Sequence, residues 1–369
     1  MKNKYLITLT PIGNYFFGGE LTFGDLNIEL AKKENERKIN YLVKGNQFPQ
    51  QTTLLGMLRY ELLRKKGWLS PLHRSIDAIK LAGTKGFDSK SSDSFGIIDK
   101  LFPIFISQGN KALIPHKHLR QSENDVGKEQ LKYIHIPILE GNGSCLTNYD
   151  AKHSIDDEYA KMTGLSEIVA EKIFDTATQI GIKKNYSGNT EENAFFKQTS
   201  YRLNKGFSFA FFAQFNQKPE FECGVIFMGG DQSLFKFEIS DPIEKTLFDE
   251  IDEQNQKIIE ESNEIDYFEI VLISDCKVSK EVFDHCLHSV NDIRDFRHII
   301  VTDKTTGFAQ MNKPDGFSKS ANKLELLTRN SILFVKGKEN LKKVAEIIDS
   351  EKAFKNIGYN FFKIIKKQI

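Results

Sequence analysis

The sequence predicts an α+β protein with two modules, each built on an antiparallel sheet. In the first half, segments with the alternating polarity of strands surround a leucine-rich segment with helical spacing. After residue 266, strand-like and helix-like segments alternate again. The 369 residues also exceed the usual size of one domain. This alternation favours the ferredoxin-like architecture for both modules.

The first module is expected to span residues 1–240. It begins with a strand in KYLITLTPI, residues 4–12, and a glycine- and aromatic-rich loop follows. Residues 68–130 are rich in Gly, Ser and Lys and predict an irregular insertion with a few strands. SIDDEYAKMTGLSEIVAEKIF, residues 154–174, predicts a helical region. Later strands are expected in QIGIKKNYS, FFKQTSYRL and GFSFAFFAQF, and CGVIFMGGDQSLFKFEIS predicts a hairpin turning at Gly229 and Gly230.

The first helix is predicted in QFPQQTTLLGMLRYELL, residues 47–63. Thr52 or Thr53 is expected to cap it, and Gly67 to end it. Its buried stripe is formed by five leucines: Leu54, Leu55, Leu58, Leu62 and Leu63. Gly56 and Arg59 lie away from the centre of this stripe. Because glycine inside a helix costs about 1 kcal/mol relative to alanine, something is expected to approach the backbone at Gly56.

The second module is expected to span residues 241–369. Its acidic start, residues 241–266, is interpreted as solvated surface charge. Strands are predicted in YFEIVLISD, FRHIIVTD, ELLTRNSILFVKG and NIGYNFFKII, and helices in SKEVFDHCLHSV and ENLKKVAEIIDSEKAF.

Composition indicates a soluble globular protein, with 40% apolar and 27% charged residues and a net charge of +1. Any anion binding must therefore come from local basic patches. The four cysteines are far apart and form no CxxC pair, which is typical of free thiols in the cytoplasm. No signal peptide or run of about 20 apolar residues is present, so a cytoplasmic location without membrane contact is expected.

Catalytic and metal-binding patterns are weak. His285 and His288 are three residues apart but have no further ligand nearby in sequence, and a helical projection turns both toward solvent. The FMGGDQ turn resembles that of polymerase and cyclase palms, yet Gln232 follows Asp231 and no companion carboxylate is evident. No Walker, GxSxG or Cys/His/Asn pattern occurs. The sequence therefore predicts no active site, metal or cofactor.

Glycine recurs beside lysine, arginine or aromatic residues in several loops: GNYFFGGELTFG, YLVKGNQFP, YRLNKGFSF and TTGFAQMNKPDGFSKS. A backbone without Cβ atoms can approach a phosphate closely and offer its N–H groups. Lysine supplies charge, and Phe or Tyr can stack on an unpaired base. Together these loops favour RNA as the ligand.

Six segments occur in a characteristic order along the chain. They are LTPIGNYFFGGELTFG, FPQQTTLLGMLRYELL, IGIKKNYSGNTEENAFFKQTSYRLNKGFSFAFF, FMGGDQSLFKFEI, TTGFAQMNKPDGFSKSANKLELLTRNSILFV and NIGYN. The chain thereby resembles, over nearly its whole length, the RAMP proteins of type III CRISPR effectors. Within them it is most similar to the Cas5-like subunit three of the type III-B (Cmr) complex. FPQQTTLLGMLR, close to a family pattern of FPPPSTLxGALR, and the block from GI to LNKGF are the most specific parts.

The resemblance implies two RAMP modules and a non-catalytic role in antiviral defence. Such a subunit grips the 5′ tag of the CRISPR RNA (crRNA) and contacts the Cas10-type large subunit and the Cmr backbone RAMP subunit, with target RNA contacted only indirectly. The implied RNA-binding residues are Lys44, Gln47, Gly56, Arg59, Lys183, Lys184, Arg202, Lys205, Gly307, Phe308, Lys313 and Lys319. On this basis, Arg59→Ala is expected to weaken RNA binding or assembly with little loss of fold.

Some positions depart from the family pattern. Phe17-Gly18 stands where Phe-Arg is frequent, Gly229-Gly230-Asp231 replaces Gly-Gly-Glu, and Phe308 replaces a tryptophan. Two alternatives to the structural subunit remain. One is a RAMP endoribonuclease that processes precursor CRISPR RNA, which would need a general base such as histidine near the RNA. The loop GNYFFGGE contains none. The other is a protein-interaction module without salt-sensitive RNA binding.

Overall fold

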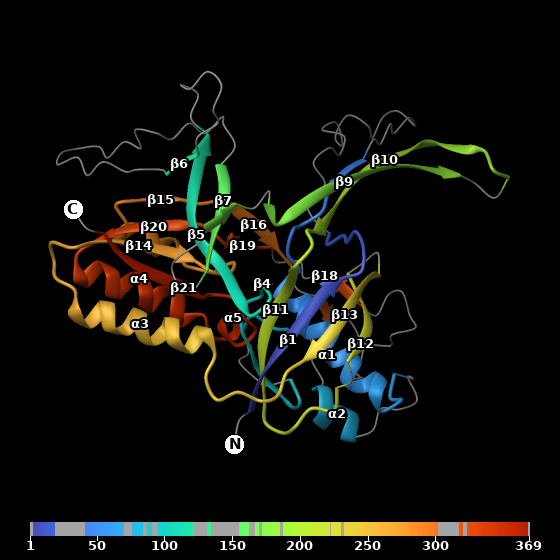
Figure 1. Ribbon diagram of the computed structural model, residues 1–369, viewed down its shortest axis with the longest axis horizontal. Coiled ribbons are helices and arrows are strands. Elements are labelled where there is room, and N and C mark those ends of the chain that lie inside the picture. Colours follow the sequence, from blue (N-terminus) through green and yellow to red (C-terminus); the bar gives the residue numbers. More distant parts are fainter. Residues whose placement is uncertain are drawn as a thin grey trace.

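The computed structural model describes residues 3–18, 41–69, 76–83, 87–90, 95–121, 131–133, 155–161, 167–169, 172–184, 187–221, 223–229, 232–297, 299–301, 317–319 and 323–367. The described part of the chain forms a mixed α+β structure whose sheets are almost entirely antiparallel, which confirms that part of the predicted fold class (Figure 1). No helix in these ranges is long and apolar enough to cross a membrane.

The largest sheet has the order β12-β13-β1-β11-β4-β5-β7-β8, with β3 paired to β11 and β6 paired to β5. Its strands are β1 (Asn3–Pro11), β3 (Ile98–Leu101), β4 (Phe105–Gln108), β5 (Lys111–Gln121), β6 (Leu131–Tyr133), β7 (Ile155–Lys161), β8 (Glu167–Val169), β11 (Phe207–Phe215), β12 (Gly224–Met228) and β13 (Ser233–Ile239). The predicted first strand and the hairpin at Gly229 are confirmed.

Two parts of this sheet differ from expectation. The helical region predicted over residues 154–174 is wrong, because β7, β8 and the start of a third strand occupy it. β7 pairs with β5 from Leu113↔Lys161 to Arg120↔Ile155, and such long-range pairing overrides local helix propensity. Residues 95–121 are also regular, since β3, β4 and β5 belong to the main sheet and not to an irregular insertion.

Helix α1 (Gln51–Lys65) lies beside α2 (Ile76–Ala82) (Figure 1). Leu54, Leu55, Leu58 and Leu62 of α1 are buried in the hydrophobic core, whereas Leu63 is half-buried. The predicted helix is confirmed, but its cap is Gln50 without a side-chain hydrogen bond, so the assignment of Thr52 or Thr53 is wrong. Gly67 follows the C-cap with φ of +69°, as expected for a residue that ends a helix.

A second, small sheet has the order β2-β10-β9, formed by β2 (Tyr41–Lys44), β9 (Phe174–Lys184) and β10 (Thr190–Leu203). β9 and β10 pair antiparallel from Arg202↔Asp175 to Phe195↔Ile182, with an irregularity before Thr190↔Lys184. Figure 1 shows them extending from the body as a long curved ribbon.

The C-terminal part contains a four-stranded sheet with the order β15-β20-β14-β21 and helices α3 and α4 along one face (Figure 1). The strands are β14 (Tyr267–Leu272), β15 (His288–Val290), β20 (Ile332–Lys336) and β21 (Phe362–Lys367), and the helices are α3 (Leu247–Glu261), α4 (Lys338–Ser350) and α5 (Lys352–Asn356). Two short pairs complete it: β16 (Ile293–Phe296) with β19 (Leu324–Leu327), and β17 (Ile299–Val301) with β18 (Phe317–Lys319).

The acidic segment is not only surface charge, because α3 lies within it. Thr246 and Asp249 form a capping box at its start, in which each side chain accepts a hydrogen bond from the other's backbone N–H. Phe248, Ile251 and Ile259 are buried. Their helical spacing shows that the helix is amphipathic, with its acidic residues on the solvent side.

One hydrophobic cluster joins residues from both halves of the chain. Phe87 contacts Phe296 and Phe354 edge-on, with ring centroids 5.9 and 5.1 Å away, and Tyr359 packs against the same pair. The two halves of the chain therefore share a core. The domain boundary at residue 240 and the presence of two ferredoxin-like modules stay predictions.

Candidate nucleic-acid interface

One face of the small sheet gathers basic side chains. Residues directly opposite one another on paired strands lie on the same face, and Lys44 lies opposite Thr199 of β10. Lys197, two residues away along β10, lies opposite Ile180 of β9. Lys44, Lys184 and Lys197 are all exposed. By strand alternation, Lys184 lies on the face of Ile180 and Ile182.

This face also carries exposed apolar side chains. Ile180 is 64% exposed and Ile182 is 52% exposed. Thr176 and Thr178 continue the face along β9, so its described side chains include no carboxylate. We call Lys44, Ile180, Ile182, Lys184 and Lys197 the ribbon face. It combines positive charge, which suits phosphate groups, with exposed apolar surface.

Sequence reasoning found Lys44 and Lys184 but missed Lys197, Ile180 and Ile182. The alternating polarity of QIGIKK predicts a strand, yet it gives no sign that both isoleucines are exposed. Only the pairing of β10 with β2 and β9 shows that Lys197 shares their face.

Other predicted residues lie near the ribbon base. Arg202 is exposed at the end of β10, opposite Asp175 and on the face opposite Lys197. Lys205 is exposed in the turn into β11. Gln47 is half-buried beyond β2, and its carbonyl oxygen accepts a hydrogen bond from the Tyr15 hydroxyl at 2.9 Å.

The remaining predicted residues are placed only in part. Lys183 lies on β9 and Lys319 ends β18, and their side chains are outside the described structure. Gly307, Phe308 and Lys313 lie outside the described residues. RNA contact stays a prediction for all five.

Gly56 lies on the exposed side of α1, in the middle of the helix. A Cβ atom added there would meet nothing within 4 Å in this chain. Packing within the chain therefore does not require glycine at this position. The free-energy cost of glycine in a helix relative to alanine has no explanation within the chain. A close approach by RNA or another protein stays the prediction for this position.

Arg59 has partners within the chain. Its Nε donates a hydrogen bond to the Ala82 carbonyl at 2.6 Å, and Nη2 donates to the Gly83 carbonyl at 3.1 Å. Both carbonyls lie at the C-terminal end of α2 and have no partner within the helix. A cation at this end also interacts favourably with the helix dipole. Burial lowers the pKa of Arg59. The guanidinium therefore holds α2 against α1, which contradicts the expectation that its removal costs little stability.

His285 and His288 belong to no cluster of possible metal ligands among the described residues. No group of three or more His, Cys, Asp or Glu residues in the described ranges is placed to hold a metal ion. His288 does not face solvent as the helical projection predicts, because residues 280–285 form a short 3₁₀ helix and residue 288 begins β15. Its ring packs on Phe334 with centroids 4.7 Å apart, and burial lowers the pKa of His288.

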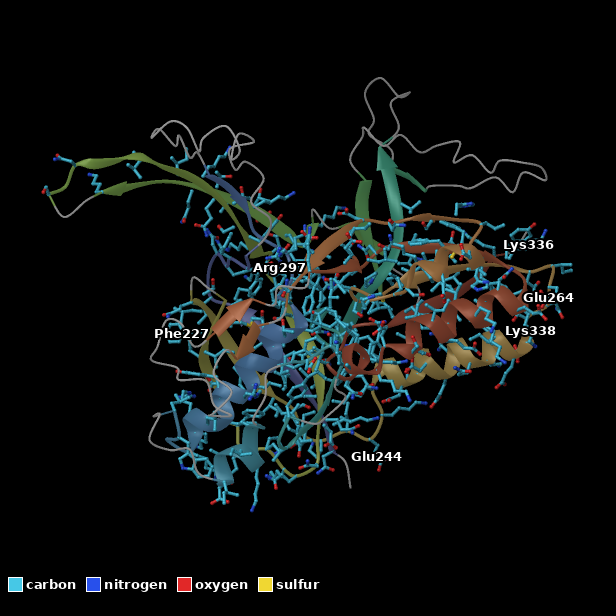
Figure 2. All side chains as sticks on the ribbon, turned by 180° about the vertical axis from the view of Figure 1, so that it is seen from behind. Phe227, Glu244, Glu264, Arg297, Lys336 and Lys338 are labelled. Carbon is cyan, nitrogen blue, oxygen red and sulfur yellow. The ribbon has the colours of Figure 1, made fainter. Side chains whose placement is uncertain are left out.

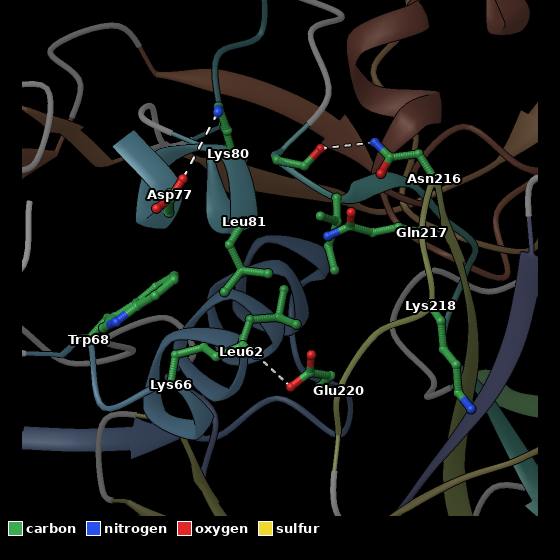
Figure 3. Close-up of a pocket in the computed structure, with 12 residues that line it drawn as sticks. Leu62, Lys66, Trp68, Asp77, Lys80, Leu81, Asn216, Gln217, Lys218 and Glu220 are labelled. Atoms are coloured by element: carbon green, nitrogen blue, oxygen red, sulfur yellow. Dashed lines mark hydrogen bonds and ion pairs between the residues drawn. The ribbon is translucent and has the colours of Figure 1, made fainter. Parts of the chain in front are cut away.

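A cavity of about 350 Å³ lies between α1, α2 and the loop after β11 (Figure 3). Leu62, Leu81 and Trp68 contribute apolar walls. Two of its lysines are paired within the chain, Lys66 with Glu220 at 2.6 Å and Lys80 with Asp77 at 4.0 Å. No predicted RNA-binding residue lines the cavity, so it is separate from the ribbon face.

Comparison with known proteins decides the family. The sequence model of the CRISPR-associated protein family Cas_Cmr3 matches residues 7–367. The chain belongs to this family. The family predicted from the sequence is thereby confirmed.

Solved structures similar to this Cas_Cmr3 chain come from type III CRISPR complexes. A chain of the type III-B Cmr-beta complex bound to cognate target RNA is 15% identical, with 97% of this chain and 96% of that chain covered and a TM-score of 0.49. A chain of the same complex with target RNA and AMPPnP is 14% identical, with 97% and 95% covered and a TM-score of 0.48. A chain of the type III-A Csm3–Csm4 subcomplex is 12% identical, with 92% and 97% covered and a TM-score of 0.34. No curated protein sequence matches the chain.

Arg59→Ala is expected to lower the free energy of unfolding by about 2 kcal/mol, because the carbonyls of Ala82 and Gly83 lose a charged donor. Urea denaturation measures the change. Lys80→Ala on α2 is the control, since the side chains of Lys80 and its partner Asp77 are both exposed. The control should change stability by less than about 0.5 kcal/mol. Equal stability of the two variants would contradict the structural role of Arg59.

Gly56→Ala is expected to raise the free energy of unfolding by about 1 kcal/mol, because the added methyl group enters open space and favours the helix. The same variant should weaken assembly with RNA and partner subunits, and Gly56→Leu should weaken it further. Urea denaturation and a binding titration separate the two effects. If both variants bind as the natural chain does, nothing approaches the backbone at this position.

Proposed function

We propose that the chain is an RNA-binding subunit of a type III-B CRISPR (Cmr) effector complex that acts in antiviral defence. In this role it holds the 5′ tag of the crRNA and contacts the Cas10-type large subunit and the backbone RAMP subunit. Membership of the Cas_Cmr3 family supports the assembly. The observation that carries RNA binding is the ribbon face, where Lys44, Lys184 and Lys197 project without a described carboxylate.

The geometry of the ribbon fits an extended single strand. β9 contains 11 residues and β10 contains 14, so the paired strands form an elongated surface. Three separated lysines can each neutralise a phosphate, while Ile180 and Ile182 offer apolar contact between them. Strand pairing orders these side chains before RNA binds, so binding need not order a flexible segment.

We also infer that both modules derive from the ferredoxin-like pattern. The C-terminal sheet supports this, because its order β15-β20-β14-β21 is that of a βαββαβ unit with η2 (Lys280–His285) in place of the first helix. In the large sheet, β13, β1, β11 and β3 are neighbours in the same manner. β12 there replaces the second helix.

Lys44, Lys184 and Lys197 are replaced together by alanine. RNA affinity of this ribbon variant is expected to fall less steeply with salt, with the slope of log affinity against log salt concentration smaller in magnitude by about 2. The reason is that each lysine bound to a phosphate of a single strand releases counterions. Fluorescence anisotropy with a labelled crRNA at several salt concentrations measures the slope. A control variant replaces Lys257, Lys342 and Lys343, which lie near glutamates on α3 and α4. An unchanged slope in the ribbon variant would exclude the ribbon face as the RNA contact.

The subunit is proposed to be non-catalytic, against the alternative of an endoribonuclease that processes precursor CRISPR RNA. Incubation of the purified chain with labelled precursor RNA in EDTA, at pH 6 to 9, is expected to leave the RNA intact. Denaturing gel electrophoresis detects any product. Cleavage at one fixed site, lost in the ribbon variant, would establish the enzyme instead, because metal-independent cutting requires a general base at the bound RNA.

A further inference from the structure

Strand β12 forms one edge of the large sheet. It pairs with β13 alone in the described part of the chain, in the register Gly224↔Phe237 to Met228↔Ser233. On its other side, alternate residues present backbone N–H and C=O groups that no described strand pairs. Such an edge is a template for a further strand.

The outward face at this edge is apolar. Val225 is 54% exposed and Phe227 is 61% exposed, while Ile226 and Met228 between and beside them are buried in the core. Figure 2 shows Phe227 at the outer margin of the molecule. Proteins usually protect an edge strand with charge, proline or a bulge, and residues 224–228 contain no charged residue or proline.

Strand β13 and the residue that follows β1 extend the apolar face. Leu234, opposite Phe227, is 41% exposed. Ile12 is 55% exposed, and its N–H donates a hydrogen bond to the Leu234 carbonyl at 3.0 Å. We call Ile12, Val225, Phe227 and Leu234 the edge patch. A contiguous exposed patch of large apolar side chains indicates an interaction site.

The charges beside the edge patch distinguish a protein partner from RNA. The charged side chains on this side of the two strands both come from β13, where Lys236 and Glu238 form an ion pair at 2.7 Å. Their charges cancel, so the strands leave no net positive charge for phosphate. The electrostatic complement of the edge patch is therefore an uncharged, apolar surface.

We propose that β12 receives an extended, uncharged segment of another protein subunit as an additional strand. Main-chain hydrogen bonds to the side of β12 that no described strand pairs provide affinity, and apolar side chains of the segment cover Val225 and Phe227. The inference rests on the proposed function, because it places the segment on a protein subunit of the effector complex. The inference adds to the proposed function that the partner subunit covers the β12 edge of this chain.

Hydrogen exchange tests the strand pairing. The full chain is measured alone, with crRNA alone, and in a complex reconstituted from the other purified Cmr subunits and crRNA. The amides of residues 224–228 that face away from β13 are expected to exchange at least about tenfold more slowly in the complex than in the free chain, because a paired edge must open before exchange. RNA alone should leave them unchanged.

Phe227→Lys tests the apolar contact. It is expected to weaken incorporation into the complex by about tenfold or more, as for a central aromatic residue of an interface. Ile265→Lys is the control, since Ile265 is 76% exposed but lies before β14. Circular dichroism confirms that both variants are folded, and RNA affinity of the free chain should be equal in both.

The outcomes separate this inference from the function on which it rests. A complex that forms while residues 224–228 exchange as in the free chain, or that accepts Phe227→Lys normally, overturns the strand addition and leaves the proposed function intact. Protection by RNA alone overturns the protein partner. If the natural chain binds crRNA but joins no complex, the proposed function fails and the inference fails with it.

Discussion

The arrangement of the whole chain depends on how the Gln51 amide is held between its two halves. Nε2 of Gln51 donates hydrogen bonds to the carbonyls of Phe102 at 3.3 Å and Gly358 at 2.8 Å. Gly358 has φ of +93°, and a Cβ atom there would lie 2.3 Å from the same nitrogen. Glycine is required for this contact. Because burial of the Nε2 donor without acceptors would be costly, these two bonds favour one relative position of α1, the turn after β3 and the C-terminal segment.

A second contact fixes the same junction. The Arg329 guanidinium lies over the Phe48 ring at 3.7 Å and donates to the Ile104 carbonyl at 3.2 Å. Asp275 accepts hydrogen bonds from the Arg329 backbone and from the Arg294 side chain, both at 2.9 Å. Polar groups thus link the halves beside the shared aromatic cluster. The ribbon face and the edge patch project from one rigid scaffold, which favours precise placement of both.

The sequence predicts elements well where local pattern decides the structure. Alternation correctly locates β9, β10 and β11, and leucine spacing locates α1. Failures arise where distant contacts decide. Residues 154–174 become strands because β5 pairs with β7. Thr246 and Asp249, which form a capping box, mark the start of α3 in the sequence. The many carboxylates of this segment led to its interpretation as surface charge, although Phe248 and Ile251 form a buried apolar face.

The candidate site is less predictable, because residue type does not show which way a side chain points. Lys44 and Arg59 are equivalent as cations in the sequence, yet one is exposed and the other holds the end of α2. The ribbon face exists only in the observed register. A shift of β10 by one residue against β9 would move Lys197 to the opposite face and separate it from Ile180. The proposed RNA surface is therefore a property of long-range strand pairing, and a list of basic residues cannot specify it.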